Sequence, residues 1–416
     1  CAIPILGGGL YLIMTHAHPI FERVFKTYDK LNNVVQENLH GMRVVKSFVR
    51  EDHEINKFKT VSGDIYNDFS KAEKIIAFNS PLMQFCMYGC MLLLSWIGAN
   101  LIVSKSMTTG ELMSLISYAT QILMSLMMLS MILVMITISR ASCERIVEVL
   151  DEKSDLTNCE NPVYEVKDGS ISFKNVCFDY SRKADRHCLN NVNVTIPSGA
   201  TVGIIGGTGS SKTSLVQLIP RLYDVTEGSV EVGGLDVREY DIESLRNEVA
   251  MVLQKNTLFS GTIKENLMWG NENATDAEIE AAAASSCVDE FIDRLPGRYD
   301  MHIEQGGVNV SGGQKQRLCI ARAILKQPKV LILDDSTSAV DTATDAKIRR
   351  AFAEDLKDTT KIIIAQRVNS VSTADKIIVM DDGKISAIGT HEELMETSEI
   401  YKDVYKSQQE GVGLRE

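Results

Sequence analysis

The sequence lacks clustered cysteines and histidines. Its nine cysteines are dispersed over 416 residues, and none belongs to a Cys-x-x-Cys pair of the kind found in zinc and redox sites. The seven histidines are also dispersed, and His16 and His18 indicate an interfacial pair rather than a metal site. We therefore expect free thiols and assign no histidine to a metal ion.

An excess of basic charge is also missing. The chain has 43 Lys and Arg against 55 Asp and Glu, for a formal net charge of -12. This balance argues against nonspecific binding of nucleic acid through a basic face, and it indicates a solvated acidic surface. No nucleic-acid partner is expected.

The N-terminal residues have neither the basic start nor the small-residue cleavage site of a signal peptide. An apolar run from Ala2 to Met14 is too short to cross a bilayer alone, because a span needs about 20 residues. We interpret this run as the end of a truncated span, and we expect the chain to be the back half of a larger membrane protein whose first spans are missing.

Charged residues are absent from two long stretches, residues 75–104 and 112–139. Each exceeds the roughly 20 residues that cross a 30 Å hydrocarbon core, so both are predicted to be transmembrane helices. Basic residues recur between residues 16 and 74, and such residues stay in the cytoplasm. We therefore place residues 15–74, and everything after Arg140, in the cytoplasm, and we expect the chain to cross the cell membrane several times.

The segment from residue 15 to residue 74 has helical spacing, with Pro19, Gly41 and Gly63 as its breakers. We expect a helical hairpin in the cytoplasm, with Gly41 interrupting the helix near a tip at residues 36–48. That tip is either a solvated turn or a docking contact for another domain, and we favour docking.

Methionines are concentrated in the second uncharged stretch. They pack against lipid and helices, or their flexible thioethers accommodate varied apolar ligands. The sequence does not name the substrate. The residues are Met113, Met124, Met127, Met128, Met131 and Met135.

The pattern changes after a polar stretch that contains Pro162. Short β-branched runs then alternate with helical segments, which indicates an α/β domain with a largely parallel sheet. These patterns predict an α-helical transmembrane domain followed by an α/β domain. The predicted boundaries are 1–150 for the membrane part, 151–168 for a linker and 169–416 for the α/β domain.

A glycine-rich loop follows the buried-strand pattern at residues 201–205. Its backbone N–H groups and the following helix N-terminus suit phosphate, Lys212 can reach the terminal phosphates, and the Thr213 hydroxyl can ligate Mg²⁺. Ser211 occupies the position where glycine normally precedes the lysine. The predicted ATP-binding residues here are Gly206, Gly207, Thr208, Gly209, Ser210, Ser211, Lys212, Thr213 and Ser214.

A second buried-strand pattern, residues 330–334, ends in Asp334, which can present its carboxylate to a nucleotide-bound Mg²⁺. Between the two motifs, four residues open another helix whose N-terminus suits anions: Ser311, Gly312, Gly313 and Gln314. With Gln254, these motifs resemble in order and spacing the ATP-binding cassette (ABC) family. Fused to membrane spans, the chain resembles half of an ABC exporter. The predicted fold class is therefore an α-helical transmembrane domain followed by an α/β P-loop ATP-binding cassette domain.

This resemblance assigns further roles within the cassette. It implies that Tyr180 stacks on adenine, and that Gln254 ligates Mg²⁺ and relays its presence to the membrane part. It also implies that the two cassettes of a dimer sandwich ATP, each completing its partner's site with the Ser311–Gln314 segment. A loop containing Ser338, Ala339 and Asp341 would cross between the cassettes.

Two departures from the family pattern lie at catalytic positions. Asp335 replaces a glutamate and is one methylene shorter, and Gln366 replaces a histidine and cannot do imidazole acid–base chemistry. Gln305 also replaces an expected glutamate. The sequence therefore predicts a subunit of a heterodimeric multidrug exporter with ATP and Mg²⁺ as cofactors, a weak site of its own and a second half-transporter as partner. A homodimeric exporter with full ATPase activity and a mainly regulatory ATP-binding subunit are the alternatives.

Overall fold

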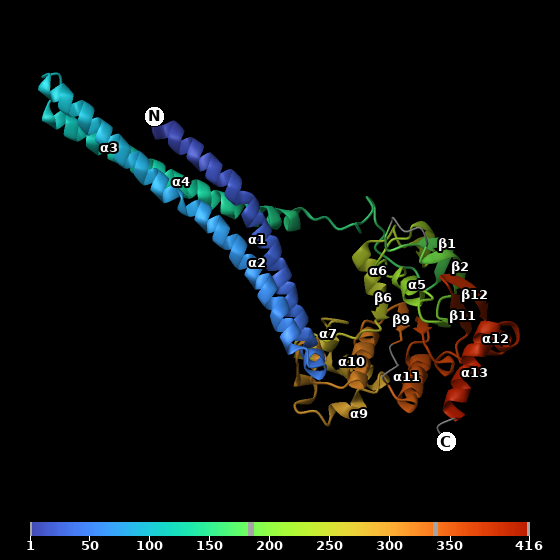
Figure 1. Cartoon of the computed structure of the whole chain (residues 1–416). Helices are drawn as coiled ribbons and strands as arrows, with labels where there is room; N and C mark the ends of the chain where they lie inside the picture. Colours follow the sequence, from blue (N-terminus) through green and yellow to red (C-terminus); the bar gives the residue numbers. More distant parts are fainter. Residues whose placement is uncertain (1, 182–186, 336–339, 414–416) are drawn as a thin grey trace. The chain divides into compact units, whose positions relative to one another are not determined.

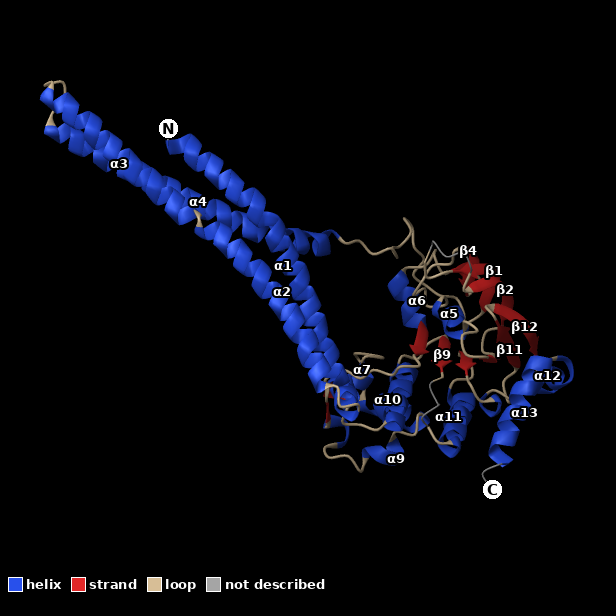
Figure 2. Cartoon of the chain, in the orientation of Figure 1, coloured by secondary structure: helices blue, strands red, loops and turns tan. Residues whose placement is uncertain are grey.

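The chain divides into two units, Cys1–Lys153 and Ser154–Glu416. The computed structural model describes residues 2–181, 187–335 and 340–413 (Figure 1). Figure 2 shows that the described part of the first unit is helical, whereas the second combines strands and helices. The first unit has four helices among its described residues: α1 (Ala2–Ser47), α2 (Glu51–Ala77), α3 (Asn79–Val103) and α4 (Thr109–Asp151).

The predicted interruption at Gly41 is wrong, because α1 continues through this residue to Ser47. A glycine inside a helix costs only about 0.5–1 kcal/mol relative to alanine, which neighbouring contacts can outweigh. Here α1 packs along α2: the Phe21 and Phe69 rings meet edge-on at 6.2 Å, and Asn38 donates to Glu54 at 3.0 Å. The hairpin therefore turns at residues 48–50, where Val49 has φ 52°.

Two helical segments are long and apolar enough to cross a membrane, Glu51–Val103 and Thr109–Leu133. They contain most of the two stretches predicted as spans. The second begins at a reciprocal cap, in which Thr108 Oγ1 accepts from the Glu111 N–H and the Glu111 carboxylate accepts from the Thr108 N–H. Its helix α4 then continues past the uncharged stretch to Asp151.

The region predicted as a linker makes regular contacts with the second unit. The residues from Ser154 onward make their contacts within that unit and belong to it. The Val163 N–H donates to the Glu239 carbonyl, and the Val163 carbonyl accepts from the Asp241 N–H, both at 2.9 Å. These bonds attach the polar stretch to the α/β unit.

The second unit contains a sheet with the order β12-β11-β3-β10-β9-β6 and an antiparallel sheet with the order β2-β1-β4-β5. Within the first of these sheets, β12 alone pairs antiparallel among the described strands. The strands of the larger sheet are β3 (Thr201–Gly206), β6 (Val249–Val252), β9 (Val330–Asp334), β10 (Thr360–Ile364), β11 (Lys376–Asp381) and β12 (Lys384–Gly389). The other strands are β1 (Ile171–Phe178), β2 (Leu189–Ile196), β4 (Glu227–Val232), β5 (Leu235–Asp236), β7 (Gly261–Thr262) and β8 (His302–Ile303).

Helices lie between the strands of the second unit and after its last strand. They are α5 (Lys212–Gln217), α6 (Ile242–Glu248), α7 (Ile263–Met268), α8 (Asp276–Ser285), α9 (Asp289–Ile292), α10 (Gly312–Leu325), α11 (Thr342–Asp355), α12 (His391–Thr397) and α13 (Glu399–Gly413). Short 3₁₀ helices are η1 (Arg298–Asp300), η2 (Gln305–Gly307) and η3 (Val368–Ser370).

The central strands are buried on both faces. Along β9, Ile332 belongs to one apolar cluster while Leu331 and Leu333 belong to the other, as expected when successive side chains point to opposite faces. On β10, Ile362 and Ile363 alternate in the same way. This double burial explains why these strands read as continuous apolar runs in the sequence.

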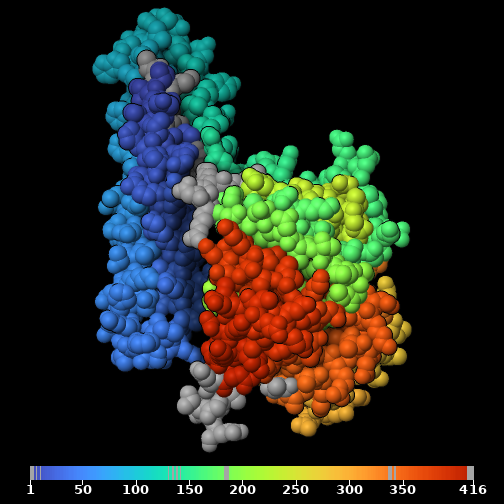
Figure 3. Space-filling view, turned by 90° about the vertical axis from the view of Figure 1, so that its right-hand side faces the viewer, coloured from blue at the N-terminus to red at the C-terminus, as the bar shows by residue number. Residues whose placement is uncertain are grey.

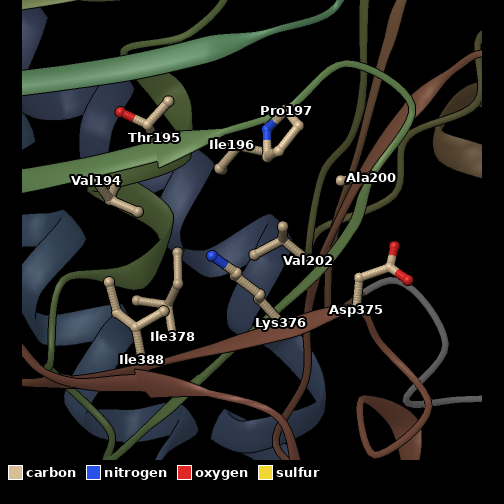
Figure 4. Close-up of a pocket in the computed structure, with 10 residues that line it drawn as sticks. All are labelled: Val194, Thr195, Ile196, Pro197, Ala200, Val202, Asp375, Lys376, Ile378 and Ile388. Carbon is tan, nitrogen blue, oxygen red and sulfur yellow. The ribbon is translucent and has the colours of Figure 1, made fainter.

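The two sheets meet where β2 approaches β12. Figure 3 shows the C-terminal part of this unit, in red, beside the green part of the chain, which includes β1 and β2. A mostly apolar cavity of about 90 Å³ lies there, lined by side chains such as Val194, Ile378 and Ile388 (Figure 4). It reaches Ala200 and Val202 at the amino end of β3, whereas the glycine-rich loop follows the opposite end of that strand.

We expect Gly203→Ala to destabilise the second unit by about 1–3 kcal/mol, the usual cost of overpacking a core. A Cβ on Gly203 would lie 2.5 Å from Val371 Cβ, an atom attached directly to the backbone and therefore unable to rotate away. The expected result is a lower Tm of the purified full chain. Gly207→Ala is the matched control, because its Cβ would meet nothing within 4 Å. Equal Tm values for the two variants would contradict this packing constraint.

Candidate functional site

The glycine-rich loop connects the carboxyl end of β3 to α5. A Cβ on Gly206 would lie 2.2 Å from the Met380 carbonyl oxygen, and Gly209 has φ 84° in the left-handed region. Glycine therefore fits both positions, the first for close approach and the second for backbone conformation. Thr208 is exposed between them. Such a loop can present its N–H groups to phosphate oxygens.

Ser211 has φ 68°, in the left-handed region that favours glycine. For a residue with a Cβ this conformation costs roughly 1–2 kcal/mol. Its hydroxyl lies 3.2 Å from Cys188 Sγ. The cost of serine at this position therefore lies in its backbone conformation.

Lys212 begins α5, and its ammonium group lies over the loop. Its Nζ donates to the carbonyls of Gly206 at 2.9 Å and Gly207 at 2.8 Å, and to Ser210 Oγ at 3.2 Å. Burial lowers the pKa of Lys212, and the nearby carboxylates of Asp334 and Asp335 oppose that shift. A phosphate bound in this loop would meet the same ammonium group.

Asp334 and Thr213 form the second part of the site. The Thr213 hydroxyl donates to Asp334 Oδ1 at 3.2 Å, although the two residues lie on α5 and β9. Burial raises the pKa of Asp334, which is only 2% exposed, whereas the Thr213 hydrogen bond and the Lys212 charge lower it. Magnesium prefers oxygen ligands and is usually held by one or two protein groups plus substrate phosphates. These two oxygens fit that description, so the predicted metal ligands Thr213 and Asp334 lie together.

Asp335 follows β9 in a left-handed conformation with φ 48°. Its N–H donates to the Ile364 carbonyl at 3.0 Å, and its Oδ2 accepts from Gln366 Nε2 at 2.8 Å. Burial raises the pKa of this carboxyl group, whereas Gln254 and Gln366 beside it lower that pKa. Asp335 and Gln366, predicted separately from the sequence, are therefore in direct contact, and Gln254 lies near them.

Tyr180, predicted to stack on adenine, contacts the other side of α5. Its hydroxyl lies 2.9 Å from Ser214 Oγ and donates to Gln217 Oε1 at 3.2 Å. The Tyr223 ring meets it edge-on at 5.1 Å, and Tyr180 remains 56% exposed. Gln217 and Tyr223 could not be predicted from the sequence, because neither belongs to a local motif. The buried Ser214 side chain contributes to the predicted site through its contact with the Tyr180 hydroxyl.

The Ser311–Gln314 segment forms the N-terminal cap of α10. Ser311 Oγ accepts from the Gln314 N–H at 3.3 Å, and Gln314 Oε1 accepts from the Ser311 N–H at 2.9 Å. The backbone of Gly312 is exposed at this cap, and Gly313 follows it within the first turn. The segment therefore presents an exposed helix N-terminus, the feature that suits an anion.

Asp341 caps α11, and its carboxylate accepts from the N–H of Thr344 at 3.0 Å and from the Thr344 hydroxyl at 2.8 Å. The hydrogen bonds from Thr344 hold the pKa of Asp341 below its usual range. Ser338 and Ala339, predicted to belong to the same loop, lie outside the described residues. Gln305 begins η2, beside Gly306, whose carbonyl accepts from Lys315 Nζ at 2.7 Å.

Both units match known protein families. A family model described as ABC transporter matches residues 189–338, and one described as ABC transporter transmembrane region matches residues 1–126. The chain is 38% identical over 406 residues to the uncharacterized ABC transporter ATP-binding protein YfiB of Bacillus subtilis (strain 168), covering 98% of this chain and 70% of YfiB.

Two further similarities concern a multidrug protein and a solved structure. The probable multidrug resistance ABC transporter ATP-binding/permease protein YheI of Bacillus subtilis (strain 168) is 32% identical over 407 residues, or 98% of this chain and 69% of YheI. The solved structure of a bacterial Atm1-family ABC exporter with ATP bound has a TM-score of 0.89 and 27% identity, covering 98% of this chain and 72% of that one. The predicted fold class is confirmed.

We expect Asp334→Asn to raise the Tm of the nucleotide-free chain at neutral pH while weakening metal-dependent nucleotide binding at least tenfold. Burial raises the pKa of Asp334. Ionisation of this carboxyl group in the folded chain therefore costs stability, which the wild type regains as pH falls through the raised pKa. The Tm difference should accordingly be largest at neutral pH and shrink on acidification.

The matched control for this prediction is Asp341→Asn. The pKa of Asp341 is lowered by its cap hydrogen bonds, so removing its charge relieves no burial cost. Thermal unfolding of the full chain over a pH series would compare the two variants. A Tm gain for Asp334→Asn that is independent of pH, or that Asp341→Asn shares, would contradict the assignment.

Proposed function

The chain belongs to the ABC transporter family, with a transmembrane region fused to its ATP-binding domain, and from this premise we propose that it is one subunit of a heterodimeric exporter with a weak ATP site of its own. An ATP-driven ABC exporter binds ATP in its cassettes and uses that binding to move its membrane helices. The finer assignment rests on the two departures from the family pattern, Asp335 and Gln366.

The contact between Asp335 and Gln366 carries the proposal. The Asp335 carboxylate accepts from the Gln366 amide at 2.8 Å, and Gln254 lies near it. A side chain one methylene shorter than glutamate holds its oxygens nearer to β9, and a misplacement on the order of 1 Å can cost about a hundredfold in rate. The amide of Gln366 donates a hydrogen bond but cannot exchange a proton as imidazole does. Both changes favour holding ATP over cleaving it.

We propose that magnesium joins this site when nucleotide binds. Thr213 and Asp334 would hold the ion, and Gln254 would lie beside it. The ion supplies positive charge to the phosphates. Around it, the chain's own residues position the triphosphate: the glycine-rich loop offers N–H groups, Lys212 adds a positive charge, and Tyr180 offers an exposed ring for adenine.

The Ser311–Gln314 cap supports the proposal of a partner subunit. Its sequence keeps the family pattern while the catalytic positions do not. In the arrangement that the family resemblance implies, this exposed helix N-terminus would complete the ATP site of the second half-transporter. The chain would then assist hydrolysis at its partner's site, and Asp341 would lie at the crossing between cassettes.

The methionines of α4 support an exporter of varied apolar compounds. The side chains of Met113, Met124, Met127, Met128, Met131 and Met135 are all exposed on the first unit. Flexible thioethers adapt to ligands of different shape, and YheI carries the description of probable multidrug resistance protein. The basic residues between positions 16 and 74 favour a multi-pass location in the cell membrane with the cassette in the cytoplasm.

We expect the purified full chain to hydrolyse ATP at least tenfold more slowly than an Asp335→Glu, Gln366→His double variant. The double variant restores both the reach of the carboxylate and the imidazole. Asp335→Glu alone should restore little, because the amide at position 366 remains. Phosphate release at saturating ATP and Mg²⁺ measures the rates, and Lys212→Ala gives the background.

Fast turnover by the wild type, equal to that of the double variant, would contradict a weak site and favour a homodimeric exporter. Absence of turnover in every variant, with ATP still bound, would favour the regulatory alternative. In a reconstituted heterodimer, removal of the partner's catalytic glutamate should abolish turnover if this chain's own site is weak.

A further inference from the structure

The loop that carries Gln366 is held by a residue near the end of the chain. Gln408, on α13, donates through Nε2 to the Gln366 carbonyl at 2.7 Å and accepts the Val368 N–H on Oε1 at 2.9 Å. Its side-chain amide thus bonds to the backbone carbonyl before Arg367 and to the backbone N–H after it. The two bonds restrict the backbone of the loop at the residue that faces Asp335.

Helix α13 is itself fixed to the core, so it can serve as a support. Tyr401 is fully buried, its hydroxyl lies 2.8 Å from His391 Nδ1, and burial raises its pKa to about 12. Val404 and Tyr405 pack against the same apolar cluster. With Gln408 they follow the spacing i, i+3, i+4, i+7, which places all four residues on one face of a helix.

The other side of the loop is also supported. Arg349 on α11 donates to the Asn369 carbonyl at 2.9 Å, and the Val368 side chain is fully buried in the same cluster as Tyr401. Because the backbone is held at these points, the Gln366 side chain extends from a fixed origin toward the Asp335 carboxylate, which it reaches at 2.8 Å. A continuous series of hydrogen bonds therefore connects α13 to the ATP site.

We propose that Gln408 is a positioning residue for ATP hydrolysis, and that the C-terminal helix α13 sets the geometry of the Asp335–Gln366 pair through it. This inference rests on the proposed role of that pair at the ATP site. Gln408 itself is bonded to the loop backbone, and it acts through Gln366. A group that displaces α13 would then change the hydrolysis rate without contacting nucleotide.

The test uses the purified full chain with Gln408→Ala, which keeps good helix propensity while removing both bonds. We expect kcat for ATP to fall about tenfold, within the range that small displacements of catalytic groups produce, while KM changes less than twofold. Gln408→Glu keeps an acceptor for the Val368 N–H but has no donor for the Gln366 carbonyl. Its kcat should therefore lie between that of the wild type and that of Gln408→Ala. Gln409→Ala is the control, because Gln409 donates to Tyr405 on its own helix and should leave kcat unchanged.

Amide hydrogen exchange at Val368 gives a second readout that does not need turnover. Exchange should accelerate at least tenfold in Gln408→Ala, less in Gln408→Glu, and not at all in Gln409→Ala. If wild-type turnover is too slow to follow, the kinetic comparison is made in the Asp335→Glu, Gln366→His background, where the backbone carbonyl of residue 366 remains.

Unchanged Val368 exchange or unchanged kcat in Gln408→Ala would overturn the proposal. A fall in kcat accompanied by weaker ATP binding and a lower Tm would also overturn it, because that pattern belongs to a general loss of structure. Fast hydrolysis by the wild type would contradict only the weak-site proposal, since the ratio of variant to wild type does not depend on the absolute rate.

Discussion

Three parallel strands of the larger sheet end at one edge, and the ATP site depends on that alignment. Ile364 at the end of β10 pairs with Asp334 at the end of β9 and with Ile204 near the end of β3. The segments that follow these strands therefore start side by side, although they lie far apart in the sequence. Lys212, Asp335 and Gln366 come together for this reason. Burial of the strands on both faces fixes their register, because a slip of one residue would exchange the two faces.

The same burial sets the electrostatics of the site. It raises the pKa of Asp334 and Asp335 and lowers the pKa of Lys212, so each ionised group costs free energy in its surroundings. The two carboxylates and the Lys212 ammonium group offset this cost for one another only in part. A magnesium–nucleotide complex at the proposed site would bring both a cation for the carboxylates and phosphates for the ammonium group, and ligand binding and local stability would then be interdependent.

Features formed by residues that lie close together in the sequence could be predicted from it. The glycine-rich loop, the cap at Ser311 and the strand ending at Asp334 each combine a local pattern with its own chemistry. The fold class followed from the uncharged stretches, the alternation of strand and helix patterns, and these motifs. The helix interruption predicted at Gly41 was wrong, because the conformational preference of one glycine is weaker than the packing of α1 along α2. Tyr223 and Gln408 could not be found, since their partners come from distant segments. The strand order of the larger sheet was equally inaccessible, because pairing between distant strands leaves no local signal.

The uninterrupted helix α1 has a mechanical consequence. Pro19 lies inside this helix and removes one backbone hydrogen bond, so the rigid part is residues 20–47, a rod roughly 42 Å long at about 1.5 Å per residue. Were it broken at Gly41, a rotation at one end would be absorbed at the break. In a continuous rod of this length, a tilt of about 5° displaces one end by roughly 4 Å relative to the other. Small rearrangements among the turns that follow Pro19 would therefore be amplified at the turn formed by residues 48–50.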